Sequence, residues 1–258
     1  MSEKYSLILA SASSARLATL QRARLTPTAR PADIDEDALL VRLREEGACP
    51  AQQVLGLAQA KARKIAREAA GESSLPTLII GCDSMLEFHG EVLGKPHSPE
   101  VALERVKALS GESGVLHTGH WMILLVSEFF TTSSIITDFA ALKSASGANG
   151  LGKAESAGIS ETEPSGDVGQ ESAGLREVGA TESTTVHFAD FTEAEAAAYV
   201  ATGEPLEVAG SFTIDGYGGA FIKGIEGDPH NVVGISLPLL RSLASDLGVF
   251  WPDLWTNS

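Results

Sequence analysis

A serine-rich turn with one arginine, SASSAR at residues 11–16, follows a short apolar run and precedes a helical pattern. A strand that enters a helix through small residues exposes backbone N–H groups at the helix start, where the helix dipole also favours an anion. Ser11 and Ser13 add hydroxyl donors, and the guanidinium of Arg16 matches the geometry of a phosphate. The turn is a candidate phosphate site, although a capping serine and a surface arginine fit the same pattern.

Two acidic features could complement such a site. Asp83 follows the apolar run 77–82, and a carboxylate at the carboxyl end of a buried strand lies where ligand crevices of α/β folds open. It could bind a metal ion, take a proton from an attacking water, or simply begin a turn. The acidic run DIDED at 33–37 could direct Glu36 and its neighbours at a metal-bound phosphate, or be a solvated loop.

Two lysines could supply positive charge. Lys61 lies beside the apolar stripe of a helical pattern over 50–70. Lys95 lies in LGKP, residues 93–96, where the following proline keeps it extended and able to reach a phosphate as a point charge. A lysine in a surface loop is the alternative, and the stretch lacks the glycine spacing and the Ser or Thr of a P-loop.

Two further motifs carry less information. His117 and His120 lie three positions apart in HTGH, and on a strand they would point to opposite faces, which argues against a shared metal. The sequence leaves a Ser-His-Asp triad open, but no GxSxG elbow supports one. GYGG at 216–219 lacks the third glycine of a dinucleotide-binding fingerprint.

Alternating strands and helices would position these residues. Short apolar runs predict strands over 6–10, 77–82, 115–126 and 184–191, with glycine-punctuated strands over 211–225. Apolar residues at helical spacing predict helices over 14–24, 50–70, 99–110, 193–201 and 239–247. The alternation predicts an α/β fold with a mixed sheet.

The composition narrows the class of protein. The 258 residues are 43% hydrophobic, enough for a sizeable core, and the net charge of −15 disfavours a broad nucleic-acid surface. The two cysteines form no disulfide framework, which favours a reducing compartment. No secretory signal and no run of about 18 apolar residues is present, so we expect a cytoplasmic protein with no membrane partner.

One stretch differs from the rest. Residues 144–183 are rich in Ser, Gly, Ala and Glu and contain few large apolar residues. Such a composition buries too little surface to offset the entropy of ordering the chain, and it predicts a disordered loop. We expect regular structure to resume at Thr184.

The order of the motifs is more specific than any one of them. They run LASASSAR at 9–16, DIDE at 33–36, a helix bearing Lys61, GCDS at 81–84, LGKP at 93–96, LSG and HTG within 109–119, AGSFTIDG at 209–216 and NVVG at 231–234. This series resembles the Maf family of nucleotide pyrophosphatases over about residues 5–126 and 184–250. The resemblance implies one domain over 1–258, with 127–183 as an insertion in a loop that the family usually keeps short.

The resemblance also implies a fold and a reaction. The fold would be similar to that of the inosine triphosphatases, an elongated mixed sheet with flanking helices and two lobes around a nucleotide cleft. The reaction would convert a nucleoside triphosphate and water to a monophosphate and diphosphate with Mg²⁺ or Mn²⁺, clearing non-canonical or pyrimidine nucleotides. Members are frequently homodimers.

The family's functional residues map onto positions of this chain. Its catalytic aspartate corresponds to Asp83, the acceptor of a proton from water, and its acidic motif corresponds to Glu36, which would share the handling of metal and water. The residues implied to bind the phosphates are Ser11, Ser13, Arg16, Lys61 and Lys95.

Three positions depart from the pattern of members that prefer dTTP and UTP. Ala15 stands where the family usually has an arginine, Ser84 where those members have threonine, and Asp215 where they have glutamine. Because these positions shape base selection in such members, the preferred base stays open. Asp215 can accept hydrogen bonds but cannot offer the amide donor of glutamine.

A second function, from another class, also fits the family. Its association with septum formation allows a nucleotide-binding regulator of cell division without significant turnover. A pure binder would not need a carboxylate at Asp83 beside cationic motifs, so we expect an enzyme. A nucleic-acid binder is disfavoured by the net charge and by the lack of a basic stripe.

Overall fold

The computed structural model describes residues 4–96, 98–126 and 175–256. Its strands are β1 (Ser6–Leu9), β2 (Thr28–Ala29), β3 (Thr77–Phe88), β4 (Glu91–Leu93), β5 (Ser113–Leu125), β6 (Leu175–Phe188) and β7 (Ile222–Glu226). The α-helices are α1 (Ser14–Arg22), α2 (Glu36–Glu45), α3 (Pro50–Ala69), α4 (Pro99–Leu109), α6 (Glu193–Ala201), α7 (Pro229–Val233) and α8 (Leu237–Asp246). Short 3-10 helices are η1 (Glu204–Glu207), η2 (Ala209–Ser211), η3 (Tyr217–Phe221) and η4 (Trp251–Leu254). Among the described helices, none is long and apolar enough to cross a membrane.

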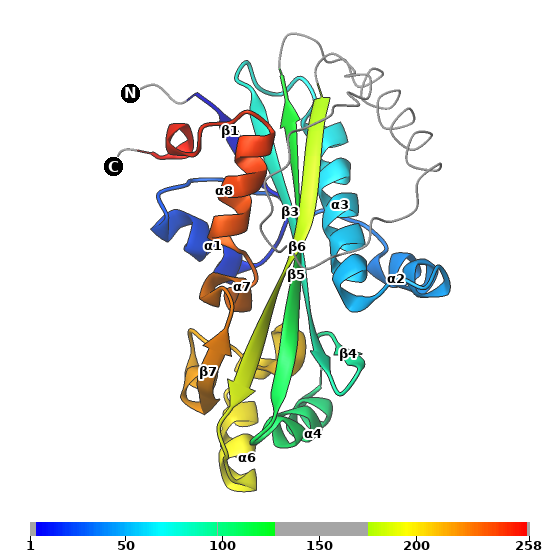
Figure 1. Ribbon diagram of the computed structural model, residues 1–258, viewed down its shortest axis with the longest axis vertical. Coiled ribbons are helices and arrows are strands. Elements are labelled where there is room, and N and C mark those ends of the chain that lie inside the picture. The colour runs from blue at the N-terminus through cyan, green and yellow to red at the C-terminus, as the bar shows by residue number, and fades with distance from the viewer. Residues whose placement is uncertain (1–3, 97, 127–174, 257–258) are drawn as a thin grey trace, which may run out of the picture.

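The strands form one mixed sheet in the order β2-β1-β3-β5-β6-β7, with β4 paired to β3 (Figure 1). Strand β1 runs parallel to β2 and β3, and the other pairs are antiparallel. The long strands β3, β5 and β6 run through the middle of the molecule (Figure 1). The expected α/β class and elongated mixed sheet are confirmed.

Strand β6 corrects one prediction. The stretch 144–183 was expected to be a disordered loop, yet residues 175–183 belong to β6, which pairs with β5 from Leu125↔Leu175 to Ser113↔His187. Composition misjudged this half of the strand because its small residues fit their partners: a Cβ at Gly179 would lie 2.1 Å from Cε3 of Trp121. The rest of that stretch, 144–174, lies outside the described residues.

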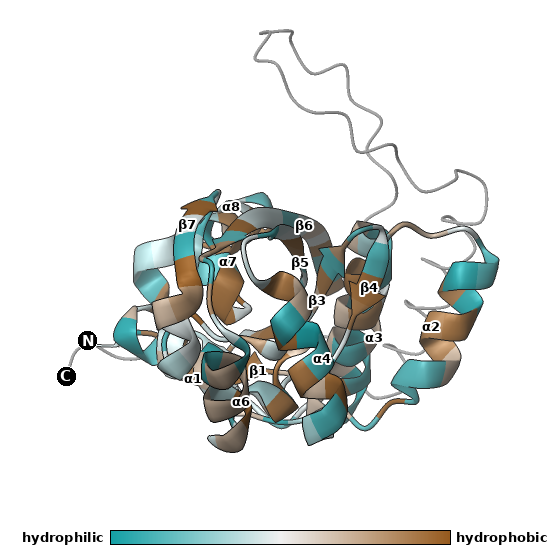
Figure 2. Cartoon of the chain, turned by 90° about the horizontal axis from the view of Figure 1, so that it is seen from below, coloured by the Kyte–Doolittle hydropathy of each residue, from teal (hydrophilic) through white to brown (hydrophobic). Residues whose placement is uncertain are grey.

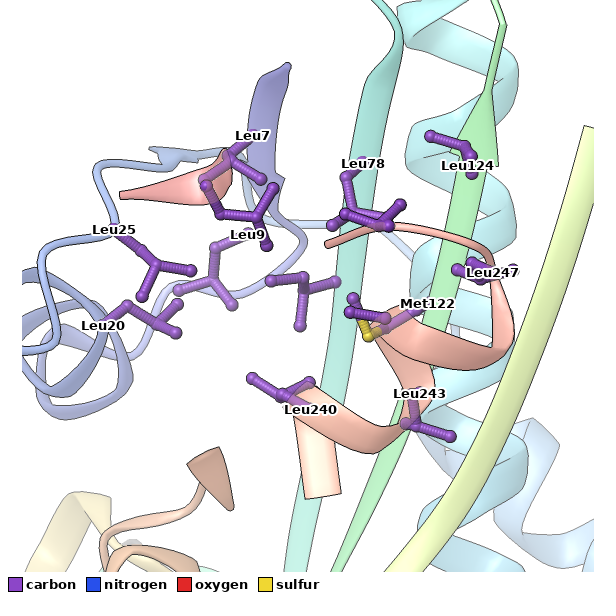
Figure 3. Close-up of a cluster of buried hydrophobic side chains, with 14 of the residues drawn as sticks. Leu7, Leu9, Leu20, Leu25, Leu78, Met122, Leu124, Leu240, Leu243 and Leu247 are labelled. Atoms are coloured by element: carbon purple, nitrogen blue, oxygen red, sulfur yellow. The ribbon is translucent and has the colours of Figure 1, made fainter. Parts of the chain in front are cut away.

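Helices cover both faces of the sheet. Helix α3 packs on one face, and α1, α7 and α8 lie on the other, as Figure 2 shows in a view along the strands. On the α8 side, a cluster of buried side chains joins β1, α1 and α8 to β3 and β5 (Figure 3). The fully buried members of this cluster include Leu9, Leu20, Leu78, Met122 and Leu240. Each fully buried leucine stabilises the fold by about 2 kcal/mol because its side chain is removed from water.

A second lobe forms at the other end of the long strands. There α4 packs against α6, η2 contacts β3 and α4, and η1 contacts α6, η2 and η3. Phe188 and Phe212 meet edge to face with ring centroids 5.0 Å apart in the core of this lobe. The two-lobed architecture is therefore confirmed, and each lobe has its own hydrophobic clusters.

The predicted helix starts are confirmed where a cap signals them. The Ser98 side chain accepts from Val101 N and precedes Pro99 at the start of α4. Thr192 and Glu195 form the expected reciprocal capping box of α6. The run DIDED is also a helix start rather than a loop, because Asp35 caps α2 by accepting from Ala38 N at 2.9 Å.

The segment 211–225 differs from its prediction. Only Ile222–Glu226 is a strand, and most of the preceding residues form 3-10 turns and irregular loop. Gly210 has φ of 73° and Ser211 has φ of 63°, a left-handed conformation that no strand uses. Glycine here marks turns, whose backbone donors are met by a side chain rather than by a neighbouring strand.

Candidate functional site

A cleft of about 800 Å³ lies between the two lobes, beside an open edge of β3. Strand β1 pairs with β3 only as far as Leu9↔Ile80, and β4 begins to pair at Leu86, so among the described strands none covers this edge from 81 to 85. The cleft lining includes every residue that the resemblance implied for the site or for base selection. These are Ser11, Ser13, Ala15, Arg16, Glu36, Lys61, Asp83, Ser84, Lys95 and Asp215.

The place of Asp83 in its strand corrects the sequence interpretation. Asp83 was expected at the carboxyl end of a strand, but it lies in the middle of β3. The crevice opens instead beyond the carboxyl end of the shorter β1, where the chain turns into α1. Because β1 is parallel to β3 and stops early, the middle of β3 is exposed to the crevice.

Asp83, Lys61 and Glu36 form a compact charged group. Lys61 Nζ lies 2.5 Å from Asp83 Oδ1 and 2.9 Å from Glu36 Oε1, so the ammonium bridges two carboxylates. Asp83 and Lys61 are each only 9% exposed, whereas Glu36 on α2 is exposed. A single cation between two acids in a mostly buried position is a strong local electrostatic arrangement.

Glycines bring Lys61 to this position. A Cβ at Gly81 on β3 would lie 2.2 Å from the carbonyl oxygen of Ala58, and one at Gly119 on β5 would lie 2.3 Å from that of Val54. Helix α3 therefore lies against the sheet at a distance that only glycine permits. The close approach lets a lysine on the buried side of α3 reach a carboxylate on β3.

Burial raises the pKa of the Asp83 carboxyl above its ordinary value, while the positive charges of Lys61 and Arg16 oppose the shift. The rise follows from the loss of water around the charged form. A carboxylate with a raised pKa is a stronger base than an exposed one, and it lies at an edge that the cleft can reach.

Arg16 is held by the protein on three sides. Its Nε donates to the carbonyl of Gly234 at 2.7 Å, its Nη1 to Ser11 Oγ at 3.0 Å and to the carbonyl of Cys82 at 3.1 Å, and its Nη2 to Ser84 Oγ at 2.8 Å. The Cys82 carbonyl belongs to the open edge of β3. Four of the five guanidinium donors thus connect the turn after β1, the edge of β3 and the end of α7.

The serines of the turn also have protein partners. Ser13 is the N-cap of α1 and accepts from Arg16 N at 3.3 Å, so the capping interpretation is confirmed. Ser11 is 8% exposed, and its hydroxyl accepts from Ser13 N at 3.2 Å. The turn is preformed, with the amino end of α1 facing the cleft.

The second lobe contributes the far wall of the cleft. The Lys95 side chain is 51% exposed, and its Nζ lies 3.9 Å from Glu207 Oε2. Asp215 is exposed in the loop 213–218. Sequence reasoning missed Glu204, whose carboxylate accepts from Thr213, Tyr217 and Gly218 in that loop. An acid between glycine-rich turns is common on surfaces, so nothing in the sequence distinguished it.

The two histidines lie on opposite faces of β5, as predicted. His117 Nε2 lies 3.0 Å from Glu87 Oε2, and its Nδ1 lies 2.8 Å from Ser183 Oγ. His120 is fully buried, and its Nε2 accepts from the backbone N of Ser236 at 2.8 Å. Over the described residues, no group of three or more His, Cys, Asp and Glu side chains is set to hold a metal.

Comparison with known proteins identifies the family of this chain. Residues 6–158 and 164–247 match the model of the Maf-like protein family. This chain belongs to the Maf-like family. A Nocardia farcinica protein named nucleoside triphosphate pyrophosphatase is 40% identical over 251 residues, which are 97% of each chain. Proteins of the same name from Rhodococcus opacus and Streptomyces coelicolor are 39% identical, over 98% and 96% of this chain and 97% and 94% of their own lengths.

The cleft of this Maf-like protein has an unusual charge balance for an anion site. Its cations are Arg16, Lys61 and Lys95. Its carboxylates are Glu36, Asp37, Asp83, Glu207 and Asp215. Because the acids outnumber the bases, the side chains alone would repel a triphosphate.

Proposed function

We propose that this protein hydrolyses nucleoside triphosphates between the α- and β-phosphates, giving a monophosphate and diphosphate. The observation that carries the proposal is the Asp83 carboxylate, largely buried beside Lys61 at the open edge of β3. The names of the relatives support the reaction class. The site is that of an enzyme, because a regulator that only bound nucleotide would not need this base.

Asp83 is the proton acceptor in the proposed mechanism. Its raised pKa increases its affinity for a proton of the attacking water, and Lys61 orients the carboxylate through the 2.5 Å contact. Lys61, Lys95 and the amino end of α1, with the hydroxyls of Ser11 and Ser13, bind the phosphates. Arg16 orders this turn and adds positive charge beside it.

The donor set fits Mg²⁺ or Mn²⁺, which we propose as the cofactor. Glu36 and Asp83 present oxygen ligands that already share one cation, the Lys61 ammonium. Such hard ions are typically held by one or two carboxylates together with substrate phosphates, so no closed cage of three ligands is needed. A bound divalent ion would supply the positive charge that the acid-rich cleft lacks and polarise the phosphoryl oxygens.

Base selection is proposed to involve Ala15, Ser84 and Asp215. Ala15 places no cation in the turn, and the Ser84 hydroxyl is shared by Arg16 at 2.8 Å and Thr118 at 2.9 Å. Of the three residues, Asp215 has a carboxylate at the cleft wall, which can accept hydrogen bonds from a base. We propose non-canonical or pyrimidine nucleotides as the substrates.

We also propose a cytoplasmic homodimer without nucleic-acid or membrane partners. Both cysteines are free thiols, and Phe250 and Trp255 expose 67% and 53% of their surface near the C-terminal end of the chain. Exposed aromatic side chains of this size are typical of interfaces. Light scattering on the purified protein checks the proposal, which predicts twice the mass of 26.9 kDa.

A nucleotide panel tests the proposed function. The protein is incubated with common and modified nucleoside triphosphates and Mg²⁺, Mn²⁺ or a chelator, beside an Asp83→Asn variant. We expect monophosphate and diphosphate in equal amounts, dependence on the metal, and loss in the variant. Release of orthophosphate and a nucleoside diphosphate would contradict the proposed cleavage position. Tight binding without turnover across the panel would favour the regulator.

A further inference from the structure

The carboxylate of Glu204 lies at the centre of the loop 213–218, which forms part of the cleft wall. Its Oε1 accepts from Thr213 Oγ1 at 2.5 Å and from Gly218 N at 2.9 Å, and its Oε2 accepts from Tyr217 N at 2.9 Å. These donors stand on both sides of Asp215 in the chain. One side chain from η1 therefore fixes the two ends of the turn that carries Asp215.

The loop packs closely against the side chains of Glu204 and Tyr199. A Cβ at Gly216 would lie 2.2 Å from Glu204 Oε2, and one at Gly218 would lie 2.5 Å from the hydroxyl oxygen of Tyr199. That hydroxyl also accepts from Thr213 N at 3.2 Å. Residues 212–216 belong to no strand or helix, so these side-chain contacts hold the loop in place of sheet hydrogen bonds.

The charge of Glu204 suits this role. Burial would raise its pKa, but the donors of Thr213, Gly218 and Tyr217 outweigh burial and hold the pKa below its ordinary value. Glu204 is therefore ionised at neutral pH, and hydrogen bonds to an ionised acceptor are the stronger kind. Glu204 itself does not line the cleft, whereas Thr213, Ile214 and Asp215 do.

We propose that Glu204 is a positioning residue for base recognition, holding the loop 213–218 so that Asp215 accepts a hydrogen bond from a ring N–H of the nucleotide base. The inference rests on the proposed function, since it assigns the base to this wall of the cleft. A carboxylate accepts but does not donate, so uracil and hypoxanthine fit it through a ring N–H. Cytosine and adenine present an acceptor nitrogen at the equivalent ring position and are disfavoured.

Two matched pairs of nucleotides test the proposal, UTP against CTP and ITP against ATP. The wild-type protein should favour UTP and ITP by about 10-fold in kcat/KM, roughly the value of one hydrogen bond. Glu204→Gln should move both ratios toward one through KM, with kcat on the preferred substrate kept within a few-fold. Asp215→Asn should do the same, and the double variant should go no further than either single variant.

Control variants separate positioning from general stability. Glu193→Gln neutralises an exposed acid of the same lobe and should leave both ratios unchanged. Thr213→Val removes one of the three donors while keeping the shape of the side chain, and it replaces Glu204→Gln if that variant does not fold. Melting temperatures are measured for all variants.

The outcomes are distinguishable. Equal losses of activity on all four nucleotides in Glu204→Gln, with unchanged ratios, would overturn the positioning role while leaving the hydrolase proposal in place. A preference for CTP and ATP in the wild type would overturn the acceptor role of Asp215. If no nucleotide were turned over, the proposed function would fall, and the same ratios measured as dissociation constants would still decide the role of Glu204.

Discussion

In the charged group of Asp83, Lys61 and Glu36, one residue destabilises the fold by its burial and another offsets that effect by its charge. Asp83 is largely buried, and its burial raises its pKa, so its ionised form destabilises the fold at neutral pH. Lys61 offsets that cost by lying 2.5 Å from it. Buried charges with shifted pKa values are typical of functional sites, where part of the folding stability is lost in exchange for activity.

Two substitutions should therefore affect stability in opposite ways. Lys61→Met leaves the buried Asp83 carboxylate without its nearest cation and should cost about 3 kcal/mol of unfolding free energy. Asp83→Asn removes the buried charge and leaves Lys61 paired with Glu36, so stability should be unchanged or higher. Urea unfolding at neutral pH measures both, and an equal loss in the two variants would refute the assigned charge balance.

His120 predicts how stability depends on pH. Burial, with a smaller effect of Arg16, lowers its pKa to about 4 from an ordinary value of 6.5. Between these two pH values the unfolded chain binds a proton at His120 and the folded protein does not. His120 therefore does not reduce the free energy of unfolding above about pH 6.5, and it reduces it increasingly as the pH falls toward 4. This linkage amounts to about 2 kcal/mol at pH 5.

A His120→Gln variant isolates this contribution. Glutamine can accept from Ser236 N but does not titrate, so the variant should lose less stability between pH 7 and pH 5 than the wild type by about 2 kcal/mol. Unfolding free energies at the two pH values give the difference, in which contributions from carboxylates cancel. Identical pH dependence would mean that His120 is not held neutral.

At the scale of elements, the site depends on how closely α3 lies on the sheet. Gly81 and Gly119 are the contact points, and both present backbone rather than side chain to the helix. The sequence predicted α3 and both strands but not their separation, because a glycine in a strand pattern is also consistent with a bulge or a turn. The closeness follows from a pairing between distant segments.

Gly119→Ala should disturb both fold and function. The added Cβ would meet the backbone of Val54 at 2.3 Å, so α3 must move, at a cost of about 3 kcal/mol. Lys61 lies two turns further along the same helix, and its displacement should lower kcat by at least about 10-fold. Gly224→Ala is the matched control, since its Cβ meets only His187 Cδ2 at 3.7 Å. Wild-type activity in Gly119→Ala would contradict this account.

Sequence reasoning predicted most of the helices and the long strands, and the residues that the resemblance implied for the site line one cleft. Caps at Ser13, Ser98 and Thr192 and apolar spacing are local, so helix starts were predictable. The first half of β6 was not, because its small residues gain stability only from the partner strand β5. Asp83 was found through its motif, while its position within β3 depends on the early end of β1.

At the scale of the whole molecule, the long strands run through both lobes, and each lobe supplies different residues to the cleft. One lobe supplies Asp83, Lys61, Glu36 and the α1 turn, and the other supplies Lys95, Asp215 and the loop fixed by Glu204. A nucleotide whose base meets the loop of Asp215, and whose phosphates lie between Lys95 and the α1 turn, would span the cleft. Substitutions in that loop should then change base preference more than the chemical step, which depends on Asp83 in the first lobe.

The central claim, that Asp83 takes a proton from the attacking water, is tested most directly by single-turnover kinetics. Excess enzyme is mixed with the best nucleotide and metal, and monophosphate formation is followed for the wild type and for Asp83→Asn. We expect nucleotide binding within a few-fold of the wild type and a rate of product formation lower by about 10²- to 10⁴-fold. A variant that binds nucleotide and turns it over at the wild-type rate would contradict the account.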